Sequence, residues 1–212
     1  MKKYDLVLLM SGGLDSTVLF YDLISKGMRV LPLFLDYGQH CVETELRTLK
    51  KVLTEVYIED LHIINIADVY RDSDSVMIKE RNLWEKQISE KDMYLPYRNL
   101  LFMTIAVSFA QSNQVNKVYS AFINSNHAKE IDCSTDFFKM LNNMLSDIGY
   151  VNIELPYKNM TKVDVLRRGI QLNAPLSITY SCQVNSTNPC GSCPNCVERL
   201  NAIKEASESN NG

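Results

Sequence analysis

Two groups of residues in this 212-residue chain could carry chemistry, one near each end. Near the C-terminus, Cys190, Cys193 and Cys196 form two overlapping CxxC steps, and Cys182 precedes them. Four thiolates at this spacing can surround one tetrahedral ion, which is a ligand set of structural Zn²⁺. The alternatives are a disulfide pair, a redox dithiol or unrelated core thiols.

A glycine turn lies near the N-terminus, where Ser11-Gly12-Gly13 separates the apolar run 6–10 from a helical pattern. Glycines allow backbone N–H groups to approach phosphate oxygens, and a helix N-terminus adds partial positive charge. Ser11, Ser16 and Thr17 supply hydroxyl donors at the same place. The chain lacks the Gly-Lys-Ser/Thr string of a P-loop, so the turn favours a different phosphate geometry.

Asp15 stands inside this predicted anion site. Phosphates repel a carboxylate unless a cation bridges the two, and Mg²⁺ can serve as that bridge. The alternative is that Gly12-Gly13 makes only a tight strand–helix turn, with Asp15 interacting with the helix dipole. The full pattern of serine, glycine and aspartate favours the phosphate site over that alternative.

Short apolar runs alternate with helical stripes along the chain, which predicts an α/β fold with a mostly parallel five-stranded sheet. Strands are expected at 6–10, 30–35, 62–66, 118–123 and 151–155. Helices are expected at 16–26, 42–56, 99–110, 135–148, 161–172 and 197–206. Ligands of such sheets bind beyond the carboxyl ends of the strands, which is where the glycine turn would lie.

Several segments carry expectations of their own. Pro32 argues against 30–35 as an interior strand, because proline gives up one ladder hydrogen bond. The segment 99–110 is apolar nearly all round, which predicts a buried helix. The polar stretch 67–95 predicts a long loop or lid, and 207–212 predicts a disordered tail.

Composition indicates one domain over 1–212, with the zinc-binding element at about 177–206. The formal charge is −3 without a basic stripe, which argues against direct nucleic-acid binding. Apolar runs are too short for a membrane span or a secretory signal. Six cysteines without such a signal predict a cytoplasmic protein with free or metal-bound thiols.

The string Ser11-Gly12-Gly13-Leu14-Asp15-Ser16 resembles the pyrophosphate loop, SGGxDS, of the ATP pyrophosphatases. The resemblance implies cleavage of ATP to AMP and pyrophosphate, with Asp15 associated with Mg²⁺. Asp36-Tyr37-Gly38-Gln39 falls where such proteins contact the nucleotide, although it could simply end a strand and make a turn. The implied nucleotide-binding residues are Met10, Ser11, Gly12, Gly13, Leu14, Asp15, Ser16, Thr17, Asp36, Tyr37 and Gln39.

Six stretches, in order along the chain, are similar to the 7-cyano-7-deazaguanine synthase family of the queuosine pathway. They are the pyrophosphate loop, 37–40, 95–100, Asp132-Cys133 with Phe137, 155–156 with 161–162, and 180–182 with 190–196 and Arg199. The resemblance implies a Rossmann-like sheet (the adenine nucleotide alpha hydrolase-like fold), a zinc site beside the cleft, and a homodimer. It also implies a ligase that adenylates 7-carboxy-7-deazaguanine with ATP and converts it with ammonia, through the amide, to the nitrile.

The segment 121–134 departs from the family pattern, with Asn126, His127, Glu130-Ile131 and Ser134 at altered positions, and Tyr97 replaces the family's glycine before the arginine. A purine-like face needs paired donors and acceptors, and each unmatched group costs roughly 1–3 kcal/mol. The altered segment therefore bears on which substrate is bound. The substrate-binding residues implied by the resemblance are Arg98, Asn99, Asn126, His127, Asp132 and Cys133.

Arg98 and Lys162 are the candidate cations for stabilising negative charge, beside Asp15 and Ser16 as further catalytic candidates. The alternatives are a surface ion pair for the arginine and a solvated first-turn lysine. For Cys133 the alternative is a buried core thiol.

Other functions fit the same residues. A variant ligase could stop at the amide or pass the acyl group to another amine, such as a protein N-terminus, since some relatives lie in antiviral operons. A tRNA-thiolating ATP pyrophosphatase is a more distant alternative, and a nucleotide-binding or zinc-bridged module without catalysis is the non-enzyme one.

Overall fold

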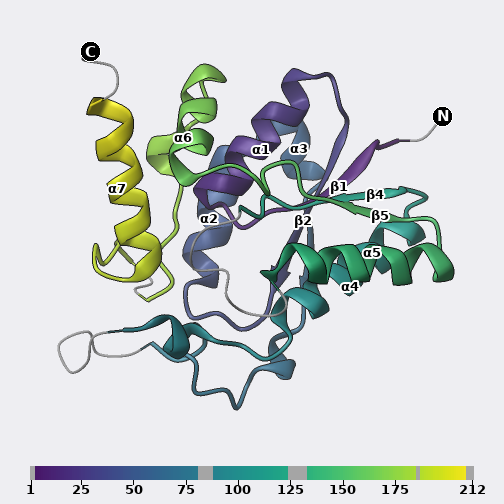
Figure 1. Cartoon of the computed structure of the whole chain (residues 1–212), viewed down its shortest axis with the longest axis horizontal. Helices are drawn as coiled ribbons and strands as arrows, with labels where there is room; N and C mark the ends of the chain where they lie inside the picture. The colour runs from purple at the N-terminus through teal and green to yellow at the C-terminus, as the bar shows by residue number, and fades with distance from the viewer. Residues whose placement is uncertain (1–2, 81–87, 124–132, 185–186, 209–212) are drawn as a thin grey trace.

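The computed structural model describes residues 3–80, 88–123, 133–184 and 187–208. Its five strands form one sheet in the order β3-β2-β1-β4-β5, and every neighbouring pair is parallel. This confirms the predicted α/β fold with a parallel five-stranded sheet (Figure 1). The strands are β1 (Leu6–Leu9), β2 (Val30–Asp36), β3 (His62–Asn65), β4 (Lys117–Tyr119) and β5 (Asn152–Glu154).

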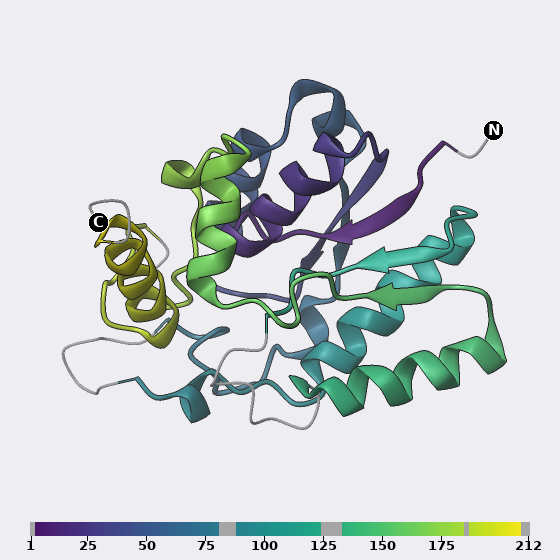
Figure 2. The same cartoon turned by 45° about the horizontal axis from the view of Figure 1, so that its top comes forward.

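Helices cover both faces of the sheet (Figures 1 and 2). The α-helices are α1 (Leu14–Ser25), α2 (Val42–Val52), α3 (Glu55–Glu59), α4 (Arg98–Ser112), α5 (Thr135–Ile148), α6 (Lys162–Gln171) and α7 (Pro194–Glu208). Short 3-10 turns lie at Ala67–Val69, Glu90–Met93 and Leu176–Ile178, two of them within the predicted loop 67–95.

Alternation along β1 separates two hydrophobic cores, because successive strand residues point to opposite faces. Leu6 and Leu8 pack in the core that α1, α2 and α6 cover, to which α7 contributes Ala202. Val7 packs in the other core, beneath α4 and α5. Both cores are built from buried aliphatic and aromatic side chains, so the sheet is held between two helical layers.

The order of the strands reverses beside β1. The chain runs from β1 outward to β2 and β3, then crosses back to β4 on the other side of β1. In such a sheet, the loops after β1 and β4 diverge and leave a crevice at the carboxyl ends of these two strands. The glycine turn follows β1 directly and therefore lies at this crevice.

Pro32 lies in an interior strand, contrary to the expectation from its missing donor. It pairs with Leu8 of β1, between strands on both sides. The carbonyl of Leu33 accepts from Met10 beside β1, and adjacent strand residues point their polar groups to opposite sides. Pro32 therefore faces the β3 side, where pairing begins only at Leu33, and no ladder bond is lost there.

Two predicted helices differ in detail. The predicted helix 42–56 is divided, because Leu53 and Thr54 are extended between α2 and α3, and Val56 is 73% exposed instead of joining the core. Helix α4 is not buried all round, since it is the outer layer on its face and fully buries only Met103, Ala106 and Ala110.

Helix α7 continues to Glu208, so Ser207 and Glu208 are helical where a disordered tail was expected. Within the described residues, no helix combines the length and apolarity that crossing a membrane requires.

Candidate active site

A cavity of 700 Å³ opens at the carboxyl ends of the strands. Cavities of roughly 300–1,000 Å³ hold cofactors and small-molecule ligands, so this one has room for a nucleotide and a second small substrate. It is lined by the glycine turn, the turn after β2, and the first residues of α4 and α6. Residues 120–123 after β4 and 180–183 of the C-terminal element complete the wall.

Most of the site residues expected from the sequence meet in this cavity. The expected residues that line it are Met10, Ser11, Gly13, Leu14, Asp15, Ser16, Tyr37, Gln39, Arg98, Asn99, Cys133 and Lys162. Gly12 and Thr17 are buried behind the turn, and Asp36 is not part of the described wall. Asn126, His127 and Asp132 lie outside the described residues.

Gly12 is the position at which the turn requires glycine. Its φ is +73°, a left-handed conformation that side chains disfavour, and an added Cβ would lie 2.9 Å from the Glu45 carbonyl oxygen. The same Cβ would lie 3.0 Å from the Leu49 backbone nitrogen. Helix α2 therefore packs directly against the backbone of the turn and fixes its shape.

The hydroxyls of the turn organise its backbone. The Gly13 N–H donates to Ser11 Oγ at 3.2 Å, and Ser16 Oγ donates to the Gly13 carbonyl at 3.3 Å. Gly13 caps α1 without a side-chain hydrogen bond, so the first turn of α1 keeps backbone donors for a ligand. Those donors and the helix dipole favour an anion at this end of the cavity.

Asp15 forms an ion pair with a residue that is 147 positions away in the sequence. Lys162 Nζ, at the start of α6, lies 2.6 Å from Asp15 Oδ2 and 3.6 Å from a Glu198 carboxylate oxygen. Asp15 Oδ1 is buried and has no hydrogen-bond partner among the described residues. An orphaned carboxylate oxygen beside an anion site is the donor that a hard cation such as Mg²⁺ takes, so these residues fit that ion.

The turn after β2 is held by its own side chains. Gln39 is buried, its Oε1 accepts from the Tyr37 N–H at 2.9 Å, and its Nε2 donates to Glu45 Oε2 at 2.8 Å. One Asp36 carboxylate oxygen accepts from the Gly38 N–H at 3.0 Å and the other from Asn65 Nδ2 at 2.8 Å. Asp36 and Gln39 therefore shape the cavity wall through bonds within the protein.

Glu45 is a cavity residue that the sequence analysis did not identify. It is 7% exposed, and burial raises the pKa of its carboxyl to about 7. Hydrogen bonds from Gln39 and Cys41 and the charge of Arg98 act in the opposite direction on this pKa. A signal was present in the sequence, because Glu45 lies on the apolar stripe with Val42 and Leu49, where a carboxylate is out of place.

Arg98 and Asn99 open α4 on the side of the cavity away from Lys162. Arg98 Nη1 lies 2.9 Å from Met77 Sδ, and Asn99 Nδ2 donates to Cys133 Sγ at 2.8 Å. Tyr97, just before them, has a φ of +53°, which is the left-handed region that favours glycine. Arg98 thus begins α4 directly after a residue in a strained conformation.

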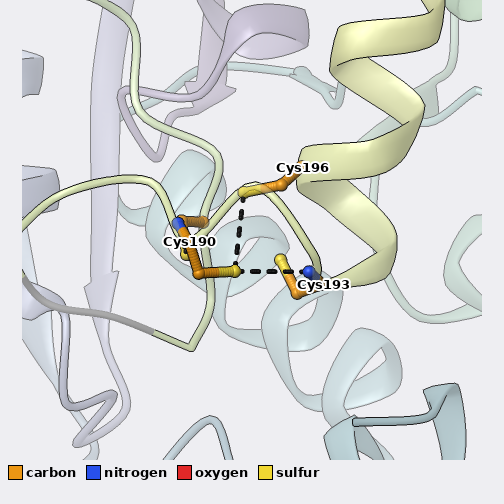
Figure 3. Close-up of side chains that lie close together, drawn as sticks. Cys190, Cys193 and Cys196 are labelled. Carbon is orange, nitrogen blue, oxygen red and sulfur yellow. Dashed lines mark hydrogen bonds between the residues drawn. The ribbon is translucent and has the colours of Figure 1, made fainter. Parts of the chain in front are cut away.

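The four C-terminal cysteines come together, as the spacing predicts. Their Sγ atoms all lie within 4.8 Å of one another, and Figure 3 shows three of them turned toward a common centre. A tetrahedral Zn²⁺ holds its sulfur ligands about 3.8 Å apart, and the Cys190 and Cys196 sulfurs are 3.9 Å apart. Each iron of a four-iron cluster takes its own thiolate, so such a cluster would hold the thiolates farther apart.

The surroundings of the cluster also favour bound thiolates. The N–H of Cys190 points at Cys182 Sγ at 3.4 Å, and the N–H of Cys193 points at Cys190 Sγ at 3.2 Å. Hydrogen bonds from Cys193 and Cys196 lower the pKa of the Cys182 thiol, while the same bonds raise the pKa of the Cys193 and Cys196 thiols. Backbone donors around sulfur are the outer contacts that orient metal ligands. The donor set could therefore bind a single zinc ion.

The cluster is joined to the glycine turn. The Tyr180 N–H donates to the Gly12 carbonyl at 3.1 Å, two residues before Cys182. Arg199, just after Cys196, donates to Thr179 Oγ1 at 2.7 Å and to the Leu176 carbonyl at 2.9 Å. Burial lowers the pKa of this guanidinium, which is fixed within the protein. The cysteine element thus forms one wall of the cavity.

A comparison with known protein families tests the family resemblance that the sequence motifs indicate. Residues 5–207 match the family described as queuosine biosynthesis protein QueC. The chain belongs to the QueC family. This confirms the resemblance drawn from the six stretches.

Two relatives of this QueC-family chain bear the same name. A 7-cyano-7-deazaguanine synthase of Caldicellulosiruptor bescii is 31% identical over 205 residues, covering 94% of this chain and 92% of the relative. A 7-cyano-7-deazaguanine synthase of Picrophilus torridus is 33% identical over 215 residues, covering 95% and 88% respectively. The match is nearly full length on both sides.

Solved structures share the fold of the QueC-family chain. The U34-tRNA thiolase NcsA from Methanococcus maripaludis, with its 4Fe-4S cluster, aligns with a TM-score of 0.54 at 15% identity, over 99% of this chain and 68% of its own. A 4-thiouridine synthetase in complex with RNA and ATP aligns with a TM-score of 0.53 at 17% identity, over 97% and 51%. At these identities the likeness concerns the fold alone.

Proposed function

We propose that this protein is an ATP-dependent ligase that adenylates the carboxylate of 7-carboxy-7-deazaguanine. The acyl adenylate then reacts with ammonia to the amide, and a second activation converts the amide to 7-cyano-7-deazaguanine. The observation that carries the proposal is the glycine turn at the mouth of a 700 Å³ cavity, with Asp15 and Lys162 paired beside it. The names of the relatives support the deazaguanine substrate.

The glycine turn would hold the pyrophosphate that leaves ATP. Backbone donors at the start of α1 point toward anions there, and Ser11 and Ser16 add hydroxyls at the wall. Preformed donors of this kind stabilise charge as it develops on a leaving group, each contributing about 10²–10³-fold in rate. Gly12 contributes by its conformation, since any side chain there would displace the turn or α2.

Asp15 would hold Mg²⁺ through its free oxygen. Lys162, beside it, would neutralise part of the negative charge of the phosphates. Bound Mg²⁺ would supply positive charge that both orients the phosphates and stabilises their developing charge. Arg98 stands on the opposite wall, where it can meet the carboxylate of the acid substrate. Asn99 and Cys133 lie at the same wall and would contact the deazapurine ring.

Four bond changes account for the amide, two bonds formed and two broken. A substrate carboxylate oxygen bonds to the α-phosphorus, and the bond from that phosphorus to pyrophosphate breaks. The amine nitrogen then bonds to the acyl carbon, and AMP leaves with the electron pair of the C–O bond. Protons released from the nitrogen pass to water. In the second activation the amide oxygen bonds to the α-phosphorus of another ATP and pyrophosphate leaves. The C–O bond then breaks as AMP departs with that oxygen, and the nitrogen gives up its two protons to water, leaving the nitrile.

We propose that the cysteine cluster holds one zinc ion with a structural role. Four thiolates leave no open coordination position, so the ion would fix residues 180–183 and the start of α7 at the cavity wall. A homodimer, a cytoplasmic location and the absence of direct nucleic-acid binding stay predictions. Only a likeness in fold supports the tRNA-thiolating alternative.

The test is a product assay on purified protein with ATP, Mg²⁺, ammonium and 7-carboxy-7-deazaguanine. We expect AMP and pyrophosphate, with products at the amide and nitrile masses. Formation of ADP and orthophosphate would overturn the adenylation. A product that stops at the amide, or that forms only with another amine such as a peptide N-terminus, would assign the chain to the variant ligases instead.

A further inference from the structure

A second cavity adjoins the first. It measures 520 Å³ and lies against the start of α6, the loop after Cys190 and the first turns of α7. Helices α6 and α7 lie side by side, as Figure 1 shows. Lys162 and Glu198 line both cavities, so their ion pair stands at the junction. A ligand in the second cavity would therefore reach the reaction site beside these two side chains.

Two carboxylates, of which Glu205 already has a partner, and one ammonium line the described part of the second cavity. Lys162 is its one cation, while Glu198 and Glu205 are its carboxylates. The ammonium of Lys162 lies at 2.6 Å from Asp15 and only at 3.6 Å from Glu198, so its hydrogen bond goes to Asp15. The side chain of Glu198 is 23% exposed. Its charge is therefore only partly neutralised and can attract a cation that enters from this side.

Glu198 is also held firmly in place. It lies in the opening turns of α7, two residues after Cys196 of the cysteine cluster. Its neighbour Arg199 binds Thr179 and the Leu176 carbonyl, which ties α7 to the preceding segment. The cysteine cluster thus sets the position of a carboxylate at the edge of the reaction cavity. That gives the metal site a role beyond general stability.

We propose that the second cavity is the binding site for the amine cosubstrate, and that Glu198 binds this amine as a primary ammonium cation. The inference rests on the proposed ligase reaction, which needs an amine to reach the acyl adenylate. In the proposed reaction ATP and the acid would occupy the first cavity, and the adjoining second cavity offers the amine a route of its own. The partly neutralised carboxylate of Glu198 suits a cation and disfavours the anionic substrates.

The size of the second cavity bears on which amine is bound. Ammonium occupies about the volume of one water molecule, on the order of 30 Å³. The cavity of 520 Å³ also accommodates a primary amine with a substituent. Ammonium and a substituted amine share the chemistry that Glu198 recognises, and kinetics with each separates them.

The experiment compares kcat/KM for the amine with kcat/KM for ATP, using ammonium chloride in one series and glycinamide in the other. We expect Glu198→Gln to lower the value for the amine at least tenfold more than the value for ATP. Glu198→Asp keeps the charge and should recover a large part of the loss. Glu208→Gln makes the same charge change on α7 outside the cavity and serves as the matched control.

Every outcome of these measurements either supports the proposed amine site or contradicts it. An equal loss in both values, or the same loss in Glu198→Asp and Glu198→Gln, would overturn the proposal. Asn201→Phe, which fills the second cavity only, checks it independently and should raise the KM for glycinamide several-fold. An unchanged KM in Asn201→Phe also counts against the proposal. If wild-type protein releases no AMP with either amine, the proposed ligase function itself fails.

Discussion

The glycine turn and the cysteine cluster form adjoining walls of one cavity but are stabilised in different ways. The turn is part of the sheet, since it follows β1 directly and its Gly12 backbone packs against α2. The cysteine cluster lies outside both main cores and forms a small core of its own. Its four sulfurs gather where one ion would complete the structure.

The contrast separates the part of the cavity that the hydrophobic cores hold in place from the part that a bound metal ion would hold in place. The hydrophobic cores fix the phosphate end whether or not a ligand is bound. The adjoining wall, with Tyr180 and Glu198, would depend on the proposed metal ion for its order. One hydrogen bond, from the Tyr180 N–H to the Gly12 carbonyl, connects the two. Perturbations should therefore act on one wall more than on the other.

Removal of the metal should have the largest effect. An ion present at 1,000 times its Kd stabilises the folded state by about 4 kcal/mol, and a chelator removes that contribution. We expect Cys193→Ser, or chelation of the wild type, to lower the melting temperature and release about one zinc per chain. Metal analysis and thermal unfolding measure both effects. Cys133→Ser is the control, and loss of zinc from that variant would contradict the four-cysteine site.

Asp15→Asn should damage the phosphate wall and leave the metal wall intact. Loss of the carboxylate removes the Lys162 partner and the free oxygen for Mg²⁺. We expect ATP–pyrophosphate exchange with the acid substrate to fall about 10²–10³-fold. Zinc content should stay at the wild-type value. Exchange within threefold of the wild type would exclude Asp15 from the reaction.

Glu45→Gln tests the buried carboxylate between the two walls. Because burial raises its pKa from 4.5 to about 7, the unfolded chain loses this proton at a lower pH than the folded protein. The stability due to this group is present below pH 4.5 and is lost as the pH rises toward 7. At pH 8, Glu45→Gln should raise the free energy of unfolding by up to about 3 kcal/mol.

The measurement for Glu45 is urea unfolding of both proteins at pH 4.5 and pH 8. At the lower pH the two should agree closely, since both side chains are then neutral. The amide can still accept the hydrogen bond from Gln39 Nε2, so the local contact is retained. A difference that does not depend on pH would show that Glu45 is not buried as a titrating group.

Gly12→Ala and Gly27→Ala form a matched pair for the rigidity of the turn. Both glycines have positive φ, +73° and +74°, but a Cβ at Gly27 would meet nothing within 4 Å. Each variant should lose about 1–2 kcal/mol from the left-handed conformation. Gly12→Ala should lose about 1–3 kcal/mol more, because its Cβ meets the backbone of α2. Equal losses in denaturant unfolding would show that the turn is not held by α2.

Local patterns predicted most of the fold. Helix α5 has the bounds 135–148 that the sequence indicates, because an amphipathic stripe and the Ser134 cap agree there. The glycine at the end of β1 and the CxxC steps also give local signals. Interior burial was harder to predict, since the apolar surface of α4 gives no sign that the helix forms an outer layer. The division of the predicted helix 42–56 likewise depends on how Leu53 packs.

The sequence predicted site residues that belong to a short motif. It predicted less well the site residues that are far apart in the sequence and meet only in the fold. Glu45 and Glu198 enter the cavity from α2 and α7, and only the packing of these helices shows it. Gln39 has the position expected of a nucleotide contact, yet its amide group is used within the protein. A motif gives the residue type, whereas the neighbours decide which polar atoms remain for a ligand.

The sequence by itself determined the strand–helix alternation, the glycine turn and the set of four cysteines, because each depends on spacing within a short segment. The tertiary structure alone decided that Lys162 meets Asp15 across 147 positions, and that the cysteine element seals the cavity through Tyr180. The reason is physical. Backbone preference acts over a few residues, while the position of a side chain in a cavity is set by the packing of elements that fold from opposite ends of the chain.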